Sequence, residues 1–204
     1  MKYTRSLTAA ATLLALGNAQ AVTVFFDTFN YTVDAAFIAE GGWTAAINTA
    51  TAGGGLGSVA GSGIMFGNPG DGESALEYNH TTALGAGDIL TMNGNVDRGS
   101  GYSYGMRIIL WDGLDLGTRT EVAGGVEGGV GPAGGADFDL TEVSYTVTAA
   151  DITAGRDQVI FKFSNEGNWG QTNEVTFDIE PVPEPSSSAL LGLAGIALIL
   201  RRRK

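Results

Sequence analysis

The chain has 204 residues, 22 of them acidic against 11 basic, and no cysteine. This length leaves room for one domain of ordinary size, and the net charge of −11 makes nucleic acid an unfavourable partner. The lack of cysteine excludes disulfides, thiolate metal sites and cysteine nucleophiles. Six of the 11 basic residues lie at the two ends of the chain. The part in between has five basic and 22 acidic residues, which gives a net charge of about −17.

Residues 1–21 have the parts of a secretory signal peptide in the right order. Lys2 and Arg5 precede an uncharged apolar run over residues 7–16, and Ala19 and Ala21 form the small-x-small pattern that signal peptidase cleaves. The alternative is a buried N-terminal helix. We expect a signal peptide and a mature chain that begins at Val22.

Residues 22–180 are expected to form an acidic, glycine-rich, all-β domain. Alternating apolar and polar residues, clearest over 143–147 and 159–163, indicate antiparallel strands with one buried face. Short strands at such intervals predict a β-sandwich of jelly-roll type. Glycine-rich residues 45–63 and 122–135 are predicted to be loops. The predicted strands are 22–26, 88–92, 102–111, 138–148, 158–163 and 174–179.

The domain offers no recognisable catalytic or metal motif. His80 is the only histidine and is predicted to be a surface residue, and a histidine-based zinc site needs at least two, so we predict no catalytic residue, no cofactor and no enzyme. Acidic pairs are numerous but unspecific. Asn93, Asn95 and Asp97 place oxygens at alternate positions without the Glu of a calcium loop, which favours a solvated turn. We predict no metal site, with structural calcium left as an open alternative.

Aromatic residues could serve as a stacking platform for sugar rings. Trp43 and Trp111 lie beside apolar stretches and are predicted to be core residues, while Tyr102 and Tyr104 remain candidates. Trp169 lies in a polar turn, where an apolar side chain calls for a reason, and it is the predicted glycan contact.

The C-terminus has three parts. Pro183, Glu184 and Pro185 end a linker (181–185) that cannot continue a strand. Residues 186–200 are predicted to be a transmembrane helix, followed by a basic cytoplasmic tail (201–204). Fifteen residues give about 22 Å of helix against ~30 Å of hydrocarbon, which suits a transient anchor.

This order of Pro183-Glu184-Pro185, apolar helix and Arg201-Arg202-Arg203 resembles the PEP-CTERM sorting signal of Gram-negative and related bacteria. The resemblance implies recognition by an exosortase, with cleavage near the Pro-Glu-Pro triplet, and association with exopolysaccharide. A sortase signal would need Leu-Pro-x-Thr-Gly, and a GPI signal would not end in cations. A plain stop-transfer anchor stays open.

A second resemblance lies in the domain itself. Phe26-Asp27-Thr28-Phe29-Asn30-Tyr31, leading to Gly41-Gly42-Trp43-Thr44, is similar to the opening of secreted jelly-roll modules. Residues 145–179 resemble the closing half of galactose-binding-like or carbohydrate-binding modules. We therefore expect an exported, non-enzymatic surface or extracellular-matrix protein that meets signal peptidase, exosortase, the membrane transiently and exopolysaccharide. It would sit in the cell envelope during sorting and then at the cell surface or outside. The alternative is a secreted carbohydrate-active enzyme or a membrane-anchored carbohydrate-binding module.

Overall fold

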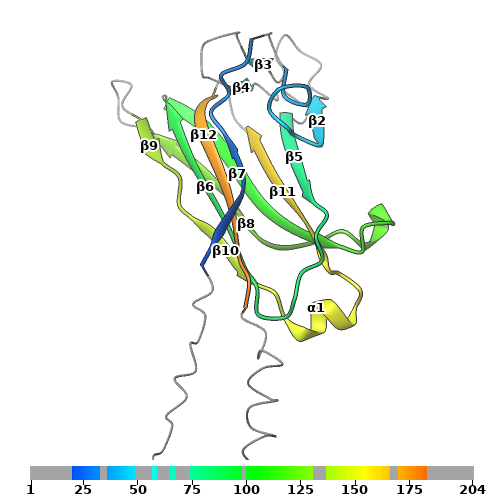
Figure 1. The fold of residues 1–204 in the computed structure, drawn as a ribbon. Coiled ribbons are helices and arrows are strands. Elements are labelled where there is room, and N and C mark those ends of the chain that lie inside the picture. Colours follow the sequence, from blue (N-terminus) through cyan, green and yellow to red (C-terminus); the bar gives the residue numbers. More distant parts are fainter. Residues whose placement is uncertain are drawn as a thin grey trace, which may run out of the picture. The chain divides into compact units, whose positions relative to one another are not determined.

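Two antiparallel β-sheets lie face to face in the computed structural model (Figure 1). The structure describes residues 20–32, 36–48, 57–58, 65–67, 74–97, 100–130, 137–165 and 170–182, all within the unit Gln20–Val182. Sheet I consists of β1 (Val22–Asp27), β3 (Gly57–Ser58), β4 (Met65–Gly67), β6 (Ile89–Asp97), β9 (Asp137–Asp139), β10 (Val143–Thr146) and β12 (Gly170–Glu180). Sheet II consists of β2 (Ala45–Asn48), β5 (Ser74–His80), β7 (Ser100–Trp111), β8 (Thr120–Val130) and β11 (Gln158–Asn165).

The long strands β6 and β12 form the centre of sheet I, whose main order is β10–β6–β12–β4–β3. β9 continues the β10 side of β6, and β1 pairs with the second half of β12. Sheet II has the order β2–β5–β11–β7–β8, so β8 is an edge strand. Two short helical turns complete the chain, η1 (Leu116–Thr118) between β7 and β8 and α1 (Ala149–Thr153) before β11.

The hydrophobic core lies between the sheets and is built from alternate residues of each strand. In β11, Val159, Phe161 and Phe163 face inward and are fully buried. Phe177 of β12 stacks on Phe161 across the gap, with ring centroids 4.9 Å apart. The intervening residues face outward, as the period of two requires. The antiparallel all-β sandwich expected from this alternation is confirmed.

The loop after β1 is held by a buried carboxylate. Asp27 accepts hydrogen bonds from the Phe29 amide at 2.7 Å, from Trp43 Nε1 at 2.5 Å and from the Tyr31 hydroxyl. Burial, and after it the hydrogen bond to Asp27, raises the pKa of Tyr31. A side chain at Gly41 would collide with the Tyr31 hydroxyl and the Phe37 carbonyl. These residues, from Asp27 to Trp43, therefore close one part of the core.

Several local predictions need correction. Residues 45–63 contain β2 and β3, and residues 122–135 contain most of β8, where loops were expected. The predicted strand 138–148 is interrupted at residues 140–142. Glycine and alanine form strand here because neighbouring strands supply the hydrogen bonds: β8 pairs with β7 from Thr120 to Val130.

The segment expected to be a calcium-free solvated turn is also a strand. Asn93, Asn95 and Asp97 belong to β6, which pairs with β12 over this stretch. Pairing on both sides overrides the turn preference of asparagine and glycine. The structure does not test the open alternative of structural calcium. In the part of the chain described, no three His, Asp or Glu side chains are grouped so that they could hold a metal ion.

The signal peptide (1–21, with Ala19) and residues 183–204 lie outside the described residues apart from Gln20 and Ala21. Within the described ranges, no helix is both long enough and apolar enough to cross a bilayer. α1, with five residues, agrees with the expectation that the domain has no long amphipathic helix.

Candidate functional site

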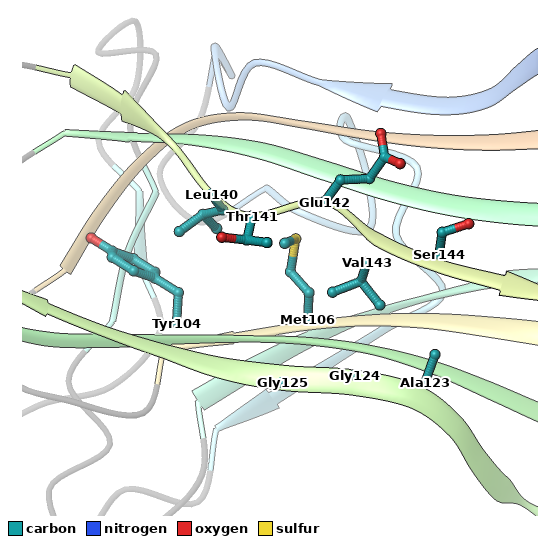
Figure 2. A pocket seen from close by; sticks show the side chains of 10 residues that line it. All are labelled: Tyr104, Met106, Ala123, Gly124, Gly125, Leu140, Thr141, Glu142, Val143 and Ser144. Atoms are coloured by element: carbon teal, nitrogen blue, oxygen red, sulfur yellow. The ribbon is translucent and has the colours of Figure 1, made fainter.

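A cleft of about 570 Å³ lies at one edge of the sandwich, where edge strand β8 of sheet II faces the segment that links β9 to β10. We call it the edge cleft. Its lining residues are Tyr104, Met106, Ala123, Gly124, Gly125, Leu140, Thr141, Glu142, Val143 and Ser144. Figure 2 shows Met106 and Val143 directed into the space between the two sides. The cleft is thus bounded by both sheets.

The floor of the edge cleft is part of the hydrophobic core. Tyr104, Met106 and Leu140 are 2%, 3% and 5% exposed and all belong to the core cluster. Leu140 is fixed by a 2.8 Å hydrogen bond from its amide to the carbonyl of Gly94. A ligand here would meet a rigid apolar surface, because close-packed core side chains have little freedom to move.

Two glycines of β8 line the cleft, but only Gly125, which pairs with Met106, faces it, because a Cβ on Gly124 would lie beside Arg107 on the outer face of sheet II. A Cβ on Gly124 would come within 2.8 Å of the Met106 carbonyl oxygen, so this position needs glycine to let β8 pair with β7. A Cβ on Gly125 would meet nothing within 4 Å. Packing therefore does not explain the glycine at position 125, whereas an open cleft does.

The rim of the edge cleft is polar. Thr141, Glu142 and Ser144 are exposed on the linking segment and on β10. Glu142 is the only carboxylate among the ten lining residues, and Figure 2 shows it directed away from the cleft. Hydrolysis of a glycosidic bond uses a pair of carboxyl groups across the scissile bond. The edge cleft has the form of a binding site with an apolar floor and a polar rim.

The outer face of sheet II carries a different surface, which we call the charged face. It contains Arg107, Arg119 and Lys162, three of the five basic residues between the two chain ends. Arg119 donates to both carboxylate oxygens of Glu77, at 3.3 and 3.4 Å. The same guanidinium lies over the Trp111 ring, 5.7 Å from its centroid. These contacts leave Trp111 only 8% exposed, so its ring is covered.

A smaller hollow of about 250 Å³ lies on sheet I. Asn93, Asp139, Glu174 and Thr176 line it together with Gly94 and Leu140. Asp139 accepts a 2.8 Å hydrogen bond from the side-chain Nδ2 of Asn95. Two carboxylates, Asp139 and Glu174, thus line this hollow, and a pair of carboxyl groups is what the enzyme alternative requires.

The structure separates the residues that the sequence singled out. Trp43 lies in the core, as predicted, whereas Trp111 is buried on the opposite face of sheet II. Tyr104 forms part of the edge-cleft floor. His80, at the end of β5, is partly buried rather than a free surface residue, and this burial lowers its pKa.

Other predicted site residues are not placed. Trp169 and the sorting residues Pro183, Glu184, Pro185, Arg201, Arg202 and Arg203 lie outside the described residues, as does the side chain of Tyr102. Met106, Leu140 and Gly125 were not predicted from the sequence to be site residues. The one usable signal was the Gly124–Gly125 pair within a stretch that otherwise has valines at strand spacing.

Comparison with known proteins separates the C-terminus from the domain. Residues 181–204 match the PEP-CTERM protein-sorting motif. No curated protein sequence matches the chain.

Solved structures resemble the domain. The xylan-binding domain CBM22-1 of Xyn10C from Paenibacillus barcinonensis has a TM-score of 0.50 at 10% identity, covering 80% of this chain and 97% of that one. The xylan-binding module CBM15 has a TM-score of 0.44 at 11% identity, covering 68% and 91%. A Stig cyclase from Fischerella sp. TAU has a TM-score of 0.42 at 14% identity, covering 59% of this chain and only 65% of the cyclase. At such identities the likeness concerns the fold. The chain carries a PEP-CTERM protein-sorting motif behind a β-sandwich similar to that of carbohydrate-binding modules.

Proposed function

We propose that this chain is an exported surface or matrix protein that an exosortase processes at its sorting motif and that binds exopolysaccharide through its sandwich. The motif at residues 181–204 supports the first part. The second part rests on the edge cleft, and above all on Gly125. Packing would allow a larger side chain at this position, and the glycine leaves that space open.

The chemistry of the edge cleft suits a neutral sugar chain. The C–H faces of a pyranose ring can pack on Met106, Leu140 and the edge of Tyr104, while its hydroxyls face Thr141 and Ser144 at the rim. The domain's surplus of acidic residues would repel a polyanion. The fold it shares with a xylan-binding domain makes xylan a reasonable first polymer, beside the host's own exopolysaccharide.

The test is retention of the full chain on immobilised xylan and on the host exopolysaccharide. Gly125→Leu should fill the cleft and weaken retention by about tenfold or more, without strain in the backbone. Ala150→Leu, at an exposed position of α1, introduces the same leucine side chain away from the cleft and should bind as the wild type does. Equal binding of Gly125→Leu and wild type would remove the edge cleft from the proposal.

Two further arms address the alternatives. Trp169→Ala tests the glycan contact proposed from the sequence. Release of reducing sugar from the same polymers tests the carbohydrate-active enzyme, with Glu174→Gln in the hollow on sheet I as its variant. Sugar release that Glu174→Gln abolishes would favour the enzyme over the binding protein.

A further inference from the structure

Two leucines on the loop between β7 and β8 are exposed to solvent. Leu114 is 92% exposed and Leu116 is 64% exposed. The other large apolar residues counted as exposed in the described ranges, such as Ile38, lie between 45% and 59%. Scattered exposed apolar residues are ordinary, but two on one short turn form a concentrated apolar tip.

Several polar groups of this loop bond to one another. Asp112 accepts hydrogen bonds from the amides of Leu114 and Asp115, at 2.9 and 2.8 Å. Asp115 accepts from the Gly117 amide at 2.8 Å, and the Thr118 hydroxyl donates to the Asp115 carbonyl at 2.7 Å. The hydrogen bonds from the backbone amides of Asp115 and Leu114 lower the pKa of Asp112.

Several amides of this loop are satisfied internally while its two leucines point outward, so the loop can approach an apolar boundary without leaving many backbone donors unpaired. The hydrogen bonds and Gly113, whose φ of +79° suits glycine, also hold the leucines in one arrangement. Because the loop is already ordered, binding through its two leucines would cost little further conformational entropy.

The strand register places this loop at the end of the sandwich from which the sorting motif leaves. Trp111, the last residue of β7, pairs with Gln158, the first of β11. At the same end, Glu180 pairs with Ile89, and the Val182 amide donates to Asp88 at 3.0 Å. Only residues 183–188 separate Val182 from the apolar run of the motif, a reach of about 20 Å at full extension.

We propose that Leu114 and Leu116 dip into the interfacial region of the bilayer while the unprocessed chain is held there by its sorting motif. This proposal rests on the membrane-held stage of the proposed function. The partner is a zwitterionic lipid surface, because Asp112 and Asp115 flank the leucines and disfavour anionic lipid. Those carboxylates also limit insertion to the headgroup boundary. The contact would orient the domain toward the membrane enzyme.

The absence of native cysteine allows a clean test. The full, unprocessed chain is reconstituted in phosphatidylcholine vesicles with one fluorophore, at Leu116→Cys or at Ile38→Cys. Ile38 is also exposed and apolar, at 59%, but lies on the loop before β2 at the other end of the sandwich (Figure 1). We expect a quencher on the lipid acyl chains to quench the label at position 116 at least about threefold more strongly than the label at position 38.

A second variant separates a lipid contact from mere proximity. Leu114→Asp, made in the chain labelled at position 116, should reduce quenching to the level of position 38, because a charge at the tip resists insertion. Equal quenching at both labelled positions, loss of the chain from the vesicles, or quenching unchanged by Leu114→Asp would each overturn the proposal. Retention on polysaccharide should not respond to Leu114→Asp, so failure of glycan binding and failure of this proposal are separate results.

Discussion

The network around Asp151 makes the stability of the domain depend on acid pH in a calculable way. Asp151 is the N3 residue of a capping box: it accepts from the amide and hydroxyl of Thr148, while its own amide donates back to that hydroxyl. Tyr145 and Arg156 donate to the same carboxylate at 2.8 and 2.7 Å. Burial alone would raise the pKa of Asp151, but these hydrogen bonds outweigh it and lower the pKa from 3.8 to about 2.

A carboxylate whose pKa is lower in the folded than in the unfolded chain stabilises the fold above the unfolded pKa, and this contribution is lost as pH falls from about 4 to about 2. The shift from 3.8 to about 2 corresponds to about 2 kcal/mol of unfolding free energy. The side chain of Asp151 is only 5% exposed, so solvent screening reduces this value little.

The assay is urea unfolding followed by tryptophan fluorescence at pH 6, 4, 3 and 2. Between pH 6 and pH 2, Asp151→Asn should lose about 2 kcal/mol less unfolding free energy than the wild type, because asparagine has no proton to gain. Glu142→Gln, at an exposed carboxylate, serves as the matched control and should follow the wild type. If the wild type and Asp151→Asn lost stability in parallel over this range, the reasoning from the hydrogen-bond network would be refuted.

Two further predictions concern the core and the edge cleft. Asp27→Ala should lower the unfolding free energy by about 3 kcal/mol or more, because three buried donors lose their acceptor. Asp139→Ala, at an exposed carboxylate, should cost within about 0.5 kcal/mol in the same urea assay, and similar losses for both would contradict the buried-donor argument. Gly124→Ala should cost about 1–3 kcal/mol, since its methyl group would press on the Met106 carbonyl, whereas Gly125→Ala should leave the urea midpoint unchanged.

The sequence predicts the parts of this fold in which one strand alone determines the pattern. In β11 the inward residues Val159, Phe161 and Phe163 recur at every second position, although Ile160 between them is also apolar, and the predicted strand ends within two residues of the observed one. β7 is predicted equally closely. Such strands have one buried face, so their own residues carry the information.

Other strands are defined by their neighbours. β8 is rich in glycine and was predicted to be a loop, yet it pairs with β7 over its whole length. The stretch around Asn93 and Asn95 has turn residues, but β12 holds it extended along β6. In both cases hydrogen bonding to a distant part of the chain outweighs the local preference, and no single segment reveals that pairing.

The candidate site was missed for a related reason. Met106 and Leu140 are core residues by every local criterion, and only the gap left at the sandwich edge makes them the floor of a cleft. The sequence directed attention to aromatic residues instead. Of these, the structure places Trp43 in the core and Trp111 beneath Arg119.

One side of the edge cleft and the leucine tip belong to the same β-hairpin, β7–β8, and this restricts how they can work together. Met106, on the cleft floor, precedes Trp111 at the end of β7 by five residues, or about 17 Å of strand. A bilayer reached by Leu114 at its headgroup boundary would therefore lie some 15–20 Å from a sugar chain in the cleft. At that distance a sugar chain in the cleft would not contact the lipid. A chain sorted at the membrane could thus hold polysaccharide before it is released, whereas a glycan site on the loop itself would compete with lipid. Gly125 is a strand glycine that packing does not require, and Leu114 and Leu116 are leucines exposed to solvent. Residues that do not suit their local structure are expected where a sequence serves binding to a partner rather than folding.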